Sequence, residues 1–283
     1  MWNLYDELYI AIPSGILVEG CVVGELWTTV RANGNIGVAR TLGGISGDPA
    51  ALAQSMIGQP LREVANWMKW DDLTRASIGV AAMNAFYNTQ DRIQALGSSD
   101  CAGCCWEGKA VSIIGELPNL AAALKDCCAL KELPLPENEH LGTAYEAAMA
   151  DDYVFISGDA LTNRTLPALL ALAGKDTCVT LAGVSVPAAP VLFAFGNPIH
   201  DLSGVYANFD TTVEAAAKLN LKDLAPGTLP FRIDPIKPRR VHEQAEVTRY
   251  KASPYKASAF NCAFNPWEGK DYDAGTWSPI FKG

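Results

Sequence analysis

The sequence predicts an α/β protein in which an α+β half precedes a mostly parallel, doubly wound sheet. Three observations predict this. Three short β-type runs precede a block of helices within the first 95 residues, and from residue 109 onward apolar strand-like runs alternate with helical ones. Such alternation is typical of a Rossmann-like parallel sheet with helices on both faces. The sequence after residue 232 has many prolines and aromatic residues but no period, which predicts an irregular extension.

We therefore expect four segments. They are an α+β domain at 1–95, a cysteine-rich linker at 96–108, a Rossmann-like domain at 109–232 and an irregular aromatic-rich tail at 233–283. A chain of 283 residues is long enough for two domains, each with a core of its own.

Composition and charge exclude several classes of protein. Apolar residues make up 49% and charged residues 19%, as in packed globular proteins. The net charge of -9 disfavours nucleic-acid binding, which depends on clustered Lys and Arg. Asp6 and Glu7 stand where a signal peptide would carry basic residues, and no apolar run is long enough to span a bilayer. We expect a cytoplasmic protein with no membrane partner.

The first half begins with helical spacing and continues with β-type runs. Residues 2–11 read as a helix that ends before Pro13. Three strands are then expected at 17–24, 26–32 and 36–40, and the Asn33-Gly34 pair marks a tight turn between the last two. These strands form a meander.

Helical patterns complete this half at 49–58, 60–70 and 71–88. Asn84 and Asn88 lie four residues apart and so share one face of the last helix. They either face a ligand or bond to neighbouring main-chain groups, and the second role is the commoner one. Residues 90–108 lack periodicity, which places the domain boundary there.

The second half alternates strands with helices. Strand-like runs occupy 111–114, 129–133, 153–157, 177–185 and 202–207. Helical segments are expected at 118–126, 141–150, 164–174, 189–196 and 211–220.

The first strand of this half leads into a turn with candidate binding residues. A dinucleotide site requires G-x-G-x-x-G here, but the sequence from 115 to 120 retains only the first glycine. A carboxylate at Glu116 would also repel phosphates at the start of the helix. Ordinary NAD or FAD binding is therefore disfavoured. The candidate residues of this turn are Gly115, Glu116, Pro118 and Asn119.

Small and polar residues also follow the later strands. Glu132 stands where Rossmann domains often carry an acid that binds a ribose hydroxyl, so it either contacts a nucleoside-like ligand or is a solvated loop acid. Ser157 ends one strand, and Gly183 and Ser185 end the next. The carboxyl ends of parallel strands share one edge of a sheet, so we expect these residues to converge there.

Four segments carry a family resemblance: SIGVAAMNAFYN, IIGELPNL, TLPALL and GVSVPAAPVLF. Together they resemble the prokaryotic family described as "putative heavy-metal chelation", over roughly residues 1–220. Members of that family combine an enolase-N-terminal-like domain with a Rossmann-like domain, and their proposed site lies in the cleft between the two. The resemblance implies an enolase-N-terminal-like fold for residues 1–95.

The resemblance also implies a site. The helix that carries Ser77, Asn84 and Asn88 would face the strand ends, whose candidate residues are Gly115, Glu116, Pro118, Ser157, Gly183 and Ser185. The implied function is binding of a metal ion or of a metal-bearing or nucleoside-like small molecule. The cysteine-rich linker and the long aromatic tail depart from the family pattern.

Cysteines offer a second kind of metal site. Cys101, Cys104 and Cys105 have the C-x-x-C spacing that lets two thiolates reach one ion, and Cys127-Cys128 would add ligands if the fold brought them near. Otherwise these thiols fill small buried volumes, which is the favoured role of the 127–128 pair. The histidines at 140, 200 and 242 stand apart, so the candidate cofactor is a soft transition metal or an iron–sulfur cluster.

Three functional classes stay open. The chain contains no G-x-S-x-G, H-E-x-x-H or Walker A motif, and no nucleophile can be named. The first class is a binding or chelating protein. The second is an enzyme acting on a nucleoside-like or tetrapyrrole-like substrate with Glu116 or Glu132 as acid or base. The third is an assembly subunit of a homo-oligomer, joined through its aromatic tail.

Overall fold

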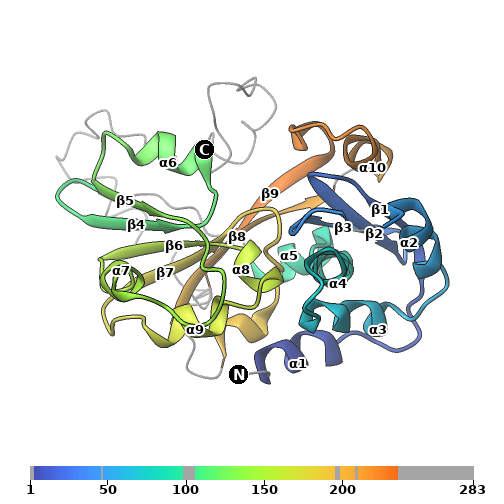
Figure 1. Cartoon of the computed structure of the whole chain (residues 1–283), viewed down its shortest axis with the longest axis horizontal. Coiled ribbons are helices and arrows are strands. Elements are labelled where there is room, and N and C mark those ends of the chain that lie inside the picture. The colour runs from blue at the N-terminus through green and yellow to red at the C-terminus, as the bar shows by residue number, and fades with distance from the viewer. Residues whose placement is uncertain (1–2, 46, 98–105, 195–197, 208–209, 235–283) are drawn as a thin grey trace, which may run out of the picture.

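The structure is a computed structural model that describes residues 3–45, 47–97, 106–194, 198–207 and 210–234. The cysteine site predicted at Cys101, Cys104 and Cys105 lies outside the described residues, as does the predicted tail after Asp234. Within the described residues the predicted α/β class is confirmed: an antiparallel sheet and helices precede a mostly parallel six-stranded sheet (Figure 1).

The first half opens with α1 (Asn3–Ile10) and the predicted meander. Its strands β1 (Val18–Val23), β2 (Trp27–Ala32) and β3 (Asn35–Arg40) pair antiparallel in chain order. The β2–β3 turn has φ of 51° at Asn33 and 71° at Gly34. Asn-Gly accepts this left-handed conformation, which matches the twist of a hairpin. The Asn-Gly turn therefore joins β2 and β3 as the hairpin that the sequence predicts.

Helices follow with capping residues that explain their starts. They are α2 (Pro49–Met56), α3 (Leu61–Ala65), the 3-10 helix η1 (Asn66–Lys69) and α4 (Leu73–Tyr87). The Asp48 side chain accepts hydrogen bonds from the first turn of α2, and Asp72 does the same for α4 through the Arg75 N–H. The single helix predicted at 60–70 is instead α3 continued by η1.

An additional helix, α5 (Gln90–Leu96), corrects the prediction of an aperiodic segment from residue 90. The Thr89 side chain caps it by accepting from the Arg92 N–H, and only Ile93 of its residues is buried. A seven-residue helix with a single buried side chain shows no hydrophobic period, so a periodicity argument passes over it.

The second half is built on one six-stranded sheet in the order β5-β4-β6-β7-β8-β9. The strands are β4 (Ala110–Ile114), β5 (Ala129–Leu133), β6 (Tyr153–Ser157), β7 (Cys178–Ala182), β8 (Ile199–Ala207) and β9 (Thr228–Ile233). The first five are mutually parallel, and β9 runs antiparallel to β8 at the edge. Sequence analysis did not predict β9, whose Pro230 is a residue that sheets tolerate at an edge.

Helical segments connect these strands, and some of them cover the two faces of the sheet. They are α6 (Pro118–Leu124), α7 (Thr143–Ala148), α8 (Asp159–Thr162), α9 (Leu166–Ala171), η2 (Pro190–Phe193), α10 (Asp210–Lys218) and η3 (Ala225–Gly227). On one face, Leu120 of α6 packs in the cluster that contains Val111 and Phe155. On the other, Leu169 of α9 packs in the cluster that contains Val154. The sheet is therefore covered on both sides, as alternating strands and helices require.

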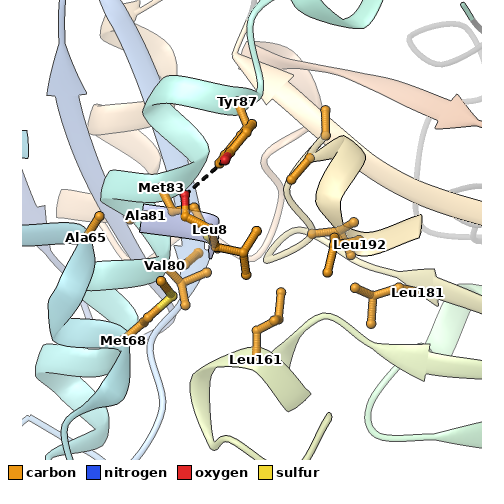
Figure 2. Close-up of a cluster of buried hydrophobic side chains, with 14 of the residues drawn as sticks. Leu8, Ala65, Met68, Val80, Ala81, Met83, Tyr87, Leu161, Leu181 and Leu192 are labelled. Carbon is orange, nitrogen blue, oxygen red and sulfur yellow. Dashed lines mark hydrogen bonds between the residues drawn. The ribbon is translucent and has the colours of Figure 1, made fainter. Parts of the chain in front are cut away.

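One hydrophobic core joins the two halves. Figure 2 shows Leu8, Val80 and Met83 of the first half facing Leu161 and Leu192 of the second. All are buried members of one cluster. The separate core expected for each half is thus not observed; the main core is continuous across the boundary.

Helix α10 strengthens this connection, because it packs on the sheet of the first half. Its Glu214 forms a two-pronged ion pair with Arg31 of β2, with Nε–Oε1 and Nη2–Oε2 distances of 3.1 and 2.9 Å. Val213 lies in one cluster with Ile36 and Val38 of β3. A helix from the second half of the sequence therefore covers one face of the N-terminal sheet.

In the part of the chain that the structure describes, no helix combines the length and apolar character needed to cross a membrane. The cytoplasmic location and the homo-oligomer stay predictions.

Candidate functional site

The order in which strands are added to the parallel sheet reverses at β4, because β5 lies on one side of β4 and β6 lies on the other. Taken in chain order, the five parallel strands have the order 2-1-3-4-5. In sheets of this order, ligands bind in the crevice at the carboxyl ends of the first and third strands, where the connections diverge. Here those strands are β4 and β6. The residues that follow them are Gly115 and Glu116, and Gly158 and Asp159.

Two glycines let these strand ends approach one another. Gly115 has φ of 94°, and a Cβ atom there would lie 2.6 Å from the Cβ of Ser157. Gly183, after β7, has φ of 120°. Both positions need a residue without a side chain, the first for space and both for backbone conformation. The predicted convergence of Gly115, Ser157 and Gly183 at one sheet edge is therefore what the structure shows.

Asp159 is the buried acid of this edge. One carboxylate oxygen, Oδ1, accepts a hydrogen bond of 2.7 Å from the Ser185 hydroxyl, and the Asp159 N–H donates to Ser157 Oγ at 3.3 Å. Burial raises the pKa of the Asp159 carboxyl above its usual range, and the hydrogen bond from Ser185 and the charge of Arg40 oppose this only in part. A carboxyl group is thus held at the switch point with its charged form disfavoured.

Arg40, the last residue of β3, brings the first half to this acid. Its Nη1 lies 3.6 Å from Asp159 Oδ2, and its Nη2 lies 2.6 Å from Glu116 Oε2. Its main-chain N–H donates to the Ser185 hydroxyl at 3.0 Å. The side chains are 9% exposed for Asp159, 31% for Arg40 and 72% for Glu116. The cluster therefore opens from a buried acid, past a half-buried cation, to solvent.

The side chains predicted on α4 form hydrogen bonds with main-chain groups around this edge. Ser77 Oγ accepts from the Leu42 N–H at 3.0 Å and donates to the Leu73 carbonyl at 2.8 Å. Asn84 Nδ2 donates to the Val38 carbonyl at 2.7 Å and approaches that of Val184 at 3.5 Å. Asn84 Oδ1 is buried and has no hydrogen-bond partner among the described residues. Such an atom carries a desolvation cost that a donor on a ligand or a water would remove.

Asn88 ties α4 to the second half. Its Nδ2 donates to the Val186 and Val205 carbonyls at 2.8 and 2.9 Å, and its Oδ1 accepts from the Ala188 N–H at 2.7 Å. All three partners are main-chain groups of the second half. This side chain positions the loop after β7 and has little hydrogen-bonding capacity left for a ligand.

The other predicted residues lie at or beside the same edge. Pro118 is exposed in the first turn of α6, and Asn119 next to it is half-buried. Glu132 is exposed on the edge strand β5, in register with Ile113 of β4. It therefore lies before the strand end rather than in the turn beyond it. A ligand role for these three residues stays a prediction.

Sequence reasoning did not include Arg40 or Asp159 among the site residues. Asp159 could have been predicted from the sequence, because it follows the apolar run of β6 and the Ser-Gly pair after that run. Arg40 gave no such signal, since it ends a strand of the other half and meets the site only through the tertiary fold.

The described residues do not form a ready-made metal site of the usual kind. Within them, no three or more His, Cys, Asp or Glu side chains are grouped so that they could hold a metal ion. Asp159 and Glu116 share the cluster with a guanidinium, which occupies the position a cation would need. Cys127 is exposed and Cys128 half-buried, away from this edge.

Two open hollows lie elsewhere on the surface. One, of about 420 Å³, lies between the β2–β3 hairpin and the helices α4 and α5; the other, of about 440 Å³, lies between β1, α2 and the end of α10. Neither is lined by Arg40, Glu116, Asp159 or Ser185. We place the candidate site by its chemistry and topology, because a buried acid and a cation at a switch point favour ligand binding more specifically than a shallow hollow does.

Comparison with known proteins bears on the family and the fold. A family model described as "Putative heavy-metal chelation" matches residues 5–87, and a second model with the same description matches residues 106–219. The chain is 29% identical to a protein of unknown function from the DUF364 family of Desulfitobacterium hafniense DCB-2, with a TM-score of 0.72 over 82% of this chain and 97% of that one.

A second solved structure from the same family, from Pyrococcus horikoshii, is 18% identical and has a TM-score of 0.63 over 82% of this chain and 98% of that one. At that identity the likeness shows the fold alone. No curated protein matches the sequence.

Proposed function

The chain belongs to the family described as "Putative heavy-metal chelation", and from this membership we propose that it binds a metal-bearing small molecule at the strand ends where its two halves meet. One observation supports the location: Asp159 is buried at the β4–β6 switch point, where it accepts a hydrogen bond from Ser185 and forms an ion pair with Arg40. Ligand sites in sheets of this order lie at that point.

The chemistry of the cluster favours a metal complex over a bare ion. A bare ion needs several protein ligands of its own, and the described residues offer no such group here. A chelated metal brings part of its ligand set with it. Arg40 suits the carboxylate or phosphate arms of such a chelator, because a guanidinium binds them through two parallel hydrogen bonds. The buried Asn84 Oδ1 would accept from a donor on the ligand.

Glu116 is the residue that a ligand would displace. Its side chain is mostly exposed, so its ion pair with Arg40 contributes little to stability. An incoming carboxylate can replace it on the guanidinium at small cost. Asp159 and Ser185 would keep Arg40 in place on the protein side.

The experiment is to purify the native full chain without chelators, then to measure bound metal and to identify retained small molecules by mass spectrometry. We expect one metal-bearing compound per chain at most, and its loss in Arg40→Gln. Lys175→Gln is the matched control, since it removes a positive charge from an exposed loop before β7, at the other end of the sheet. Equal retention in both variants would refute the site, and a wild-type protein that retains and binds no metal compound would refute the function.

A second candidate function, catalysis on the bound ligand, has one specific observation in its favour. Burial raises the pKa of Asp159, so its carboxyl group keeps a proton to higher pH than an exposed acid and could donate it to a nucleoside-like or tetrapyrrole-like substrate. This proposal predicts that the retained compound is converted to a product, and that the rate falls as the pH rises through the pKa of Asp159. An unchanged rate in Asp159→Asn would exclude this role.

A further inference from the structure

Two adjacent cysteines lie at the opposite end of the parallel sheet from the strand-end site. Cys127 and Cys128 occupy the turn between α6 and β5. The next residue, Ala129, donates its N–H to the Lys109 carbonyl, which places the turn at the amino ends of β4 and β5. The cysteine pair is therefore separate from the candidate site. An inference about the pair does not depend on the function proposed for that site.

The two thiols lie close to the same helix end. Cys127 Sγ approaches the Ala123 carbonyl at 3.5 Å, and Cys128 Sγ approaches the Leu124 carbonyl at 3.4 Å. These carbonyls belong to the last turn of α6, which carries the partial negative charge of the helix dipole. Burial, and after it the neighbouring Cys127, raises the pKa of the Cys128 thiol. A raised pKa means that a soft electrophile must displace the proton of Cys128 when it binds there.

The ordinary role of a cysteine as a small core residue accounts for only one member of the pair. Cys128 is half-buried and packs against the cluster formed by Trp106 and the α6 face of the sheet. Cys127 is exposed and fills no buried volume. The exposed thiol thus lies beside a partly sheltered one, in a turn whose backbone is fixed by α6 before it and β5 after it.

We propose that Cys127 and Cys128 form a dithiol site for a soft electrophile that needs only two thiolates from the protein, such as Hg²⁺ or a monosubstituted arsenic(III) compound. Thiolates are the protein ligands that soft ions prefer. Among the described residues no third His, Cys, Asp or Glu completes a group with them, so an electrophile that two thiolates satisfy suits the pair. With Hg²⁺, two S–Hg bonds form and the two S–H groups release two protons. With phenylarsine oxide, two S–As bonds replace the As–O bonding, and the oxygen leaves with both thiol protons as water.

The test uses the reduced full chain and phenylarsine oxide. After reaction, proteolysis and mass spectrometry locate each arsenic on the peptide that carries it. We expect one adduct that bridges the two thiols of the 127–128 pair, that survives excess 2-mercaptoethanol and that is removed by the dithiol 2,3-dimercaptopropanol. Cys127→Ser and Cys128→Ser should each lose this adduct, so that bound arsenic falls by one per chain.

Cys178→Ser is the matched control, since it removes another half-buried thiol at the start of β7 and should retain the adduct. The proposal is overturned if the wild-type peptide carries no bridging adduct, if excess monothiol removes it, or if either single serine variant keeps it. Circular dichroism of each variant separates loss of the site from loss of the fold.

Discussion

At the scale of single residues, the burial of Asp159 makes stability depend on pH. A carboxyl group whose pKa is higher in the folded than in the unfolded chain binds its proton more tightly when folded. Its contribution to the free energy of unfolding therefore falls as the pH rises from the unfolded value, about 4, through the folded one.

We expect Asp159→Asn, which cannot ionise, to become more stable relative to wild type as the pH rises through that window. Urea unfolding at several pH values measures the difference. Asp176→Asn, which changes an exposed acid, should show no such trend. A difference between Asp159→Asn and wild type that stays constant with pH would contradict the raised pKa.

Asn88 gives a second prediction at this scale. Its amide satisfies three buried main-chain groups of the second half. Leaving a buried polar group unpaired costs about 1–3 kcal/mol. Asn88→Ala should therefore lower the free energy of unfolding by about 3 kcal/mol or more. Asn138→Ala removes an exposed amide with one local bond, to the His140 N–H, and should change it by less than about 0.5 kcal/mol. Similar losses in the two variants would show that Asn88 does not join the halves.

At the scale of elements, the close packing of α4 on β3 depends on Gly37. A Cβ atom at this position would lie 2.0 Å from the Ala81 carbonyl oxygen and 2.0 Å from the Ala85 nitrogen, both main-chain atoms of α4. Main chain cannot move aside as a flexible side chain can. Gly37→Ala should therefore lower the free energy of unfolding by about 3 kcal/mol, at the upper end of what overpacking costs.

Gly15→Ala is the matched control for this variant, because nothing lies within 4 Å of the Cβ it would add. It should alter the free energy of unfolding by less than about 0.5 kcal/mol in the same denaturant titration. If Gly37→Ala lowered the free energy of unfolding no more than Gly15→Ala does, α4 would not pack on β3 as closely as in the structure.

The elements also show what sequence could and could not predict. Local signals were enough for the meander, through the Asn33-Gly34 turn, and for the start of α4, through the Asp72 cap. They were not enough for α5, which has one buried residue, or for β9, which pairs only at the sheet edge. The short helix α8, which begins at Asp159, was also not predicted.

The site was predictable to the same extent. Strand ends could be read from apolar runs, and so Gly115, Ser157, Gly183 and Ser185 were predicted to lie together. Arg40 meets Ser185 across 145 residues of sequence, and no local pattern records such a contact. Helical spacing also could not decide whether Asn84 and Asn88 contact a ligand or hydrogen-bond to main-chain groups. Both roles place the two side chains on the same helix face.

At the scale of the whole molecule, the continuous core predicts one cooperative unfolding transition. Leu8 and Val80 of the first half share a cluster with Leu161 and Leu192 of the second, so neither half can lose its packing alone. We expect tryptophan fluorescence and far-ultraviolet circular dichroism to give the same denaturation midpoint. Two separate transitions would contradict the shared core.

A fragment of residues 1–108 tests the same point from the other side. It lacks α10, whose Val213 and Glu214 cover the face of the N-terminal sheet that includes Ile36 and Arg31. We expect this fragment to show no cooperative transition, whereas the full chain does. A fragment that unfolds cooperatively would show that the first half is self-sufficient.

The position of α10 also has a consequence for biosynthesis. The sheet that it covers ends at Arg40, but the helix ends at Lys218, so 178 residues must be added before the covering helix is complete. At translation rates of about 5–20 residues per second, this delay is on the order of ten to forty seconds. During that time the nascent chain exposes Ile36 and Val38 as it leaves the ribosome, and chaperones that recognise apolar strands have their main opportunity to bind it.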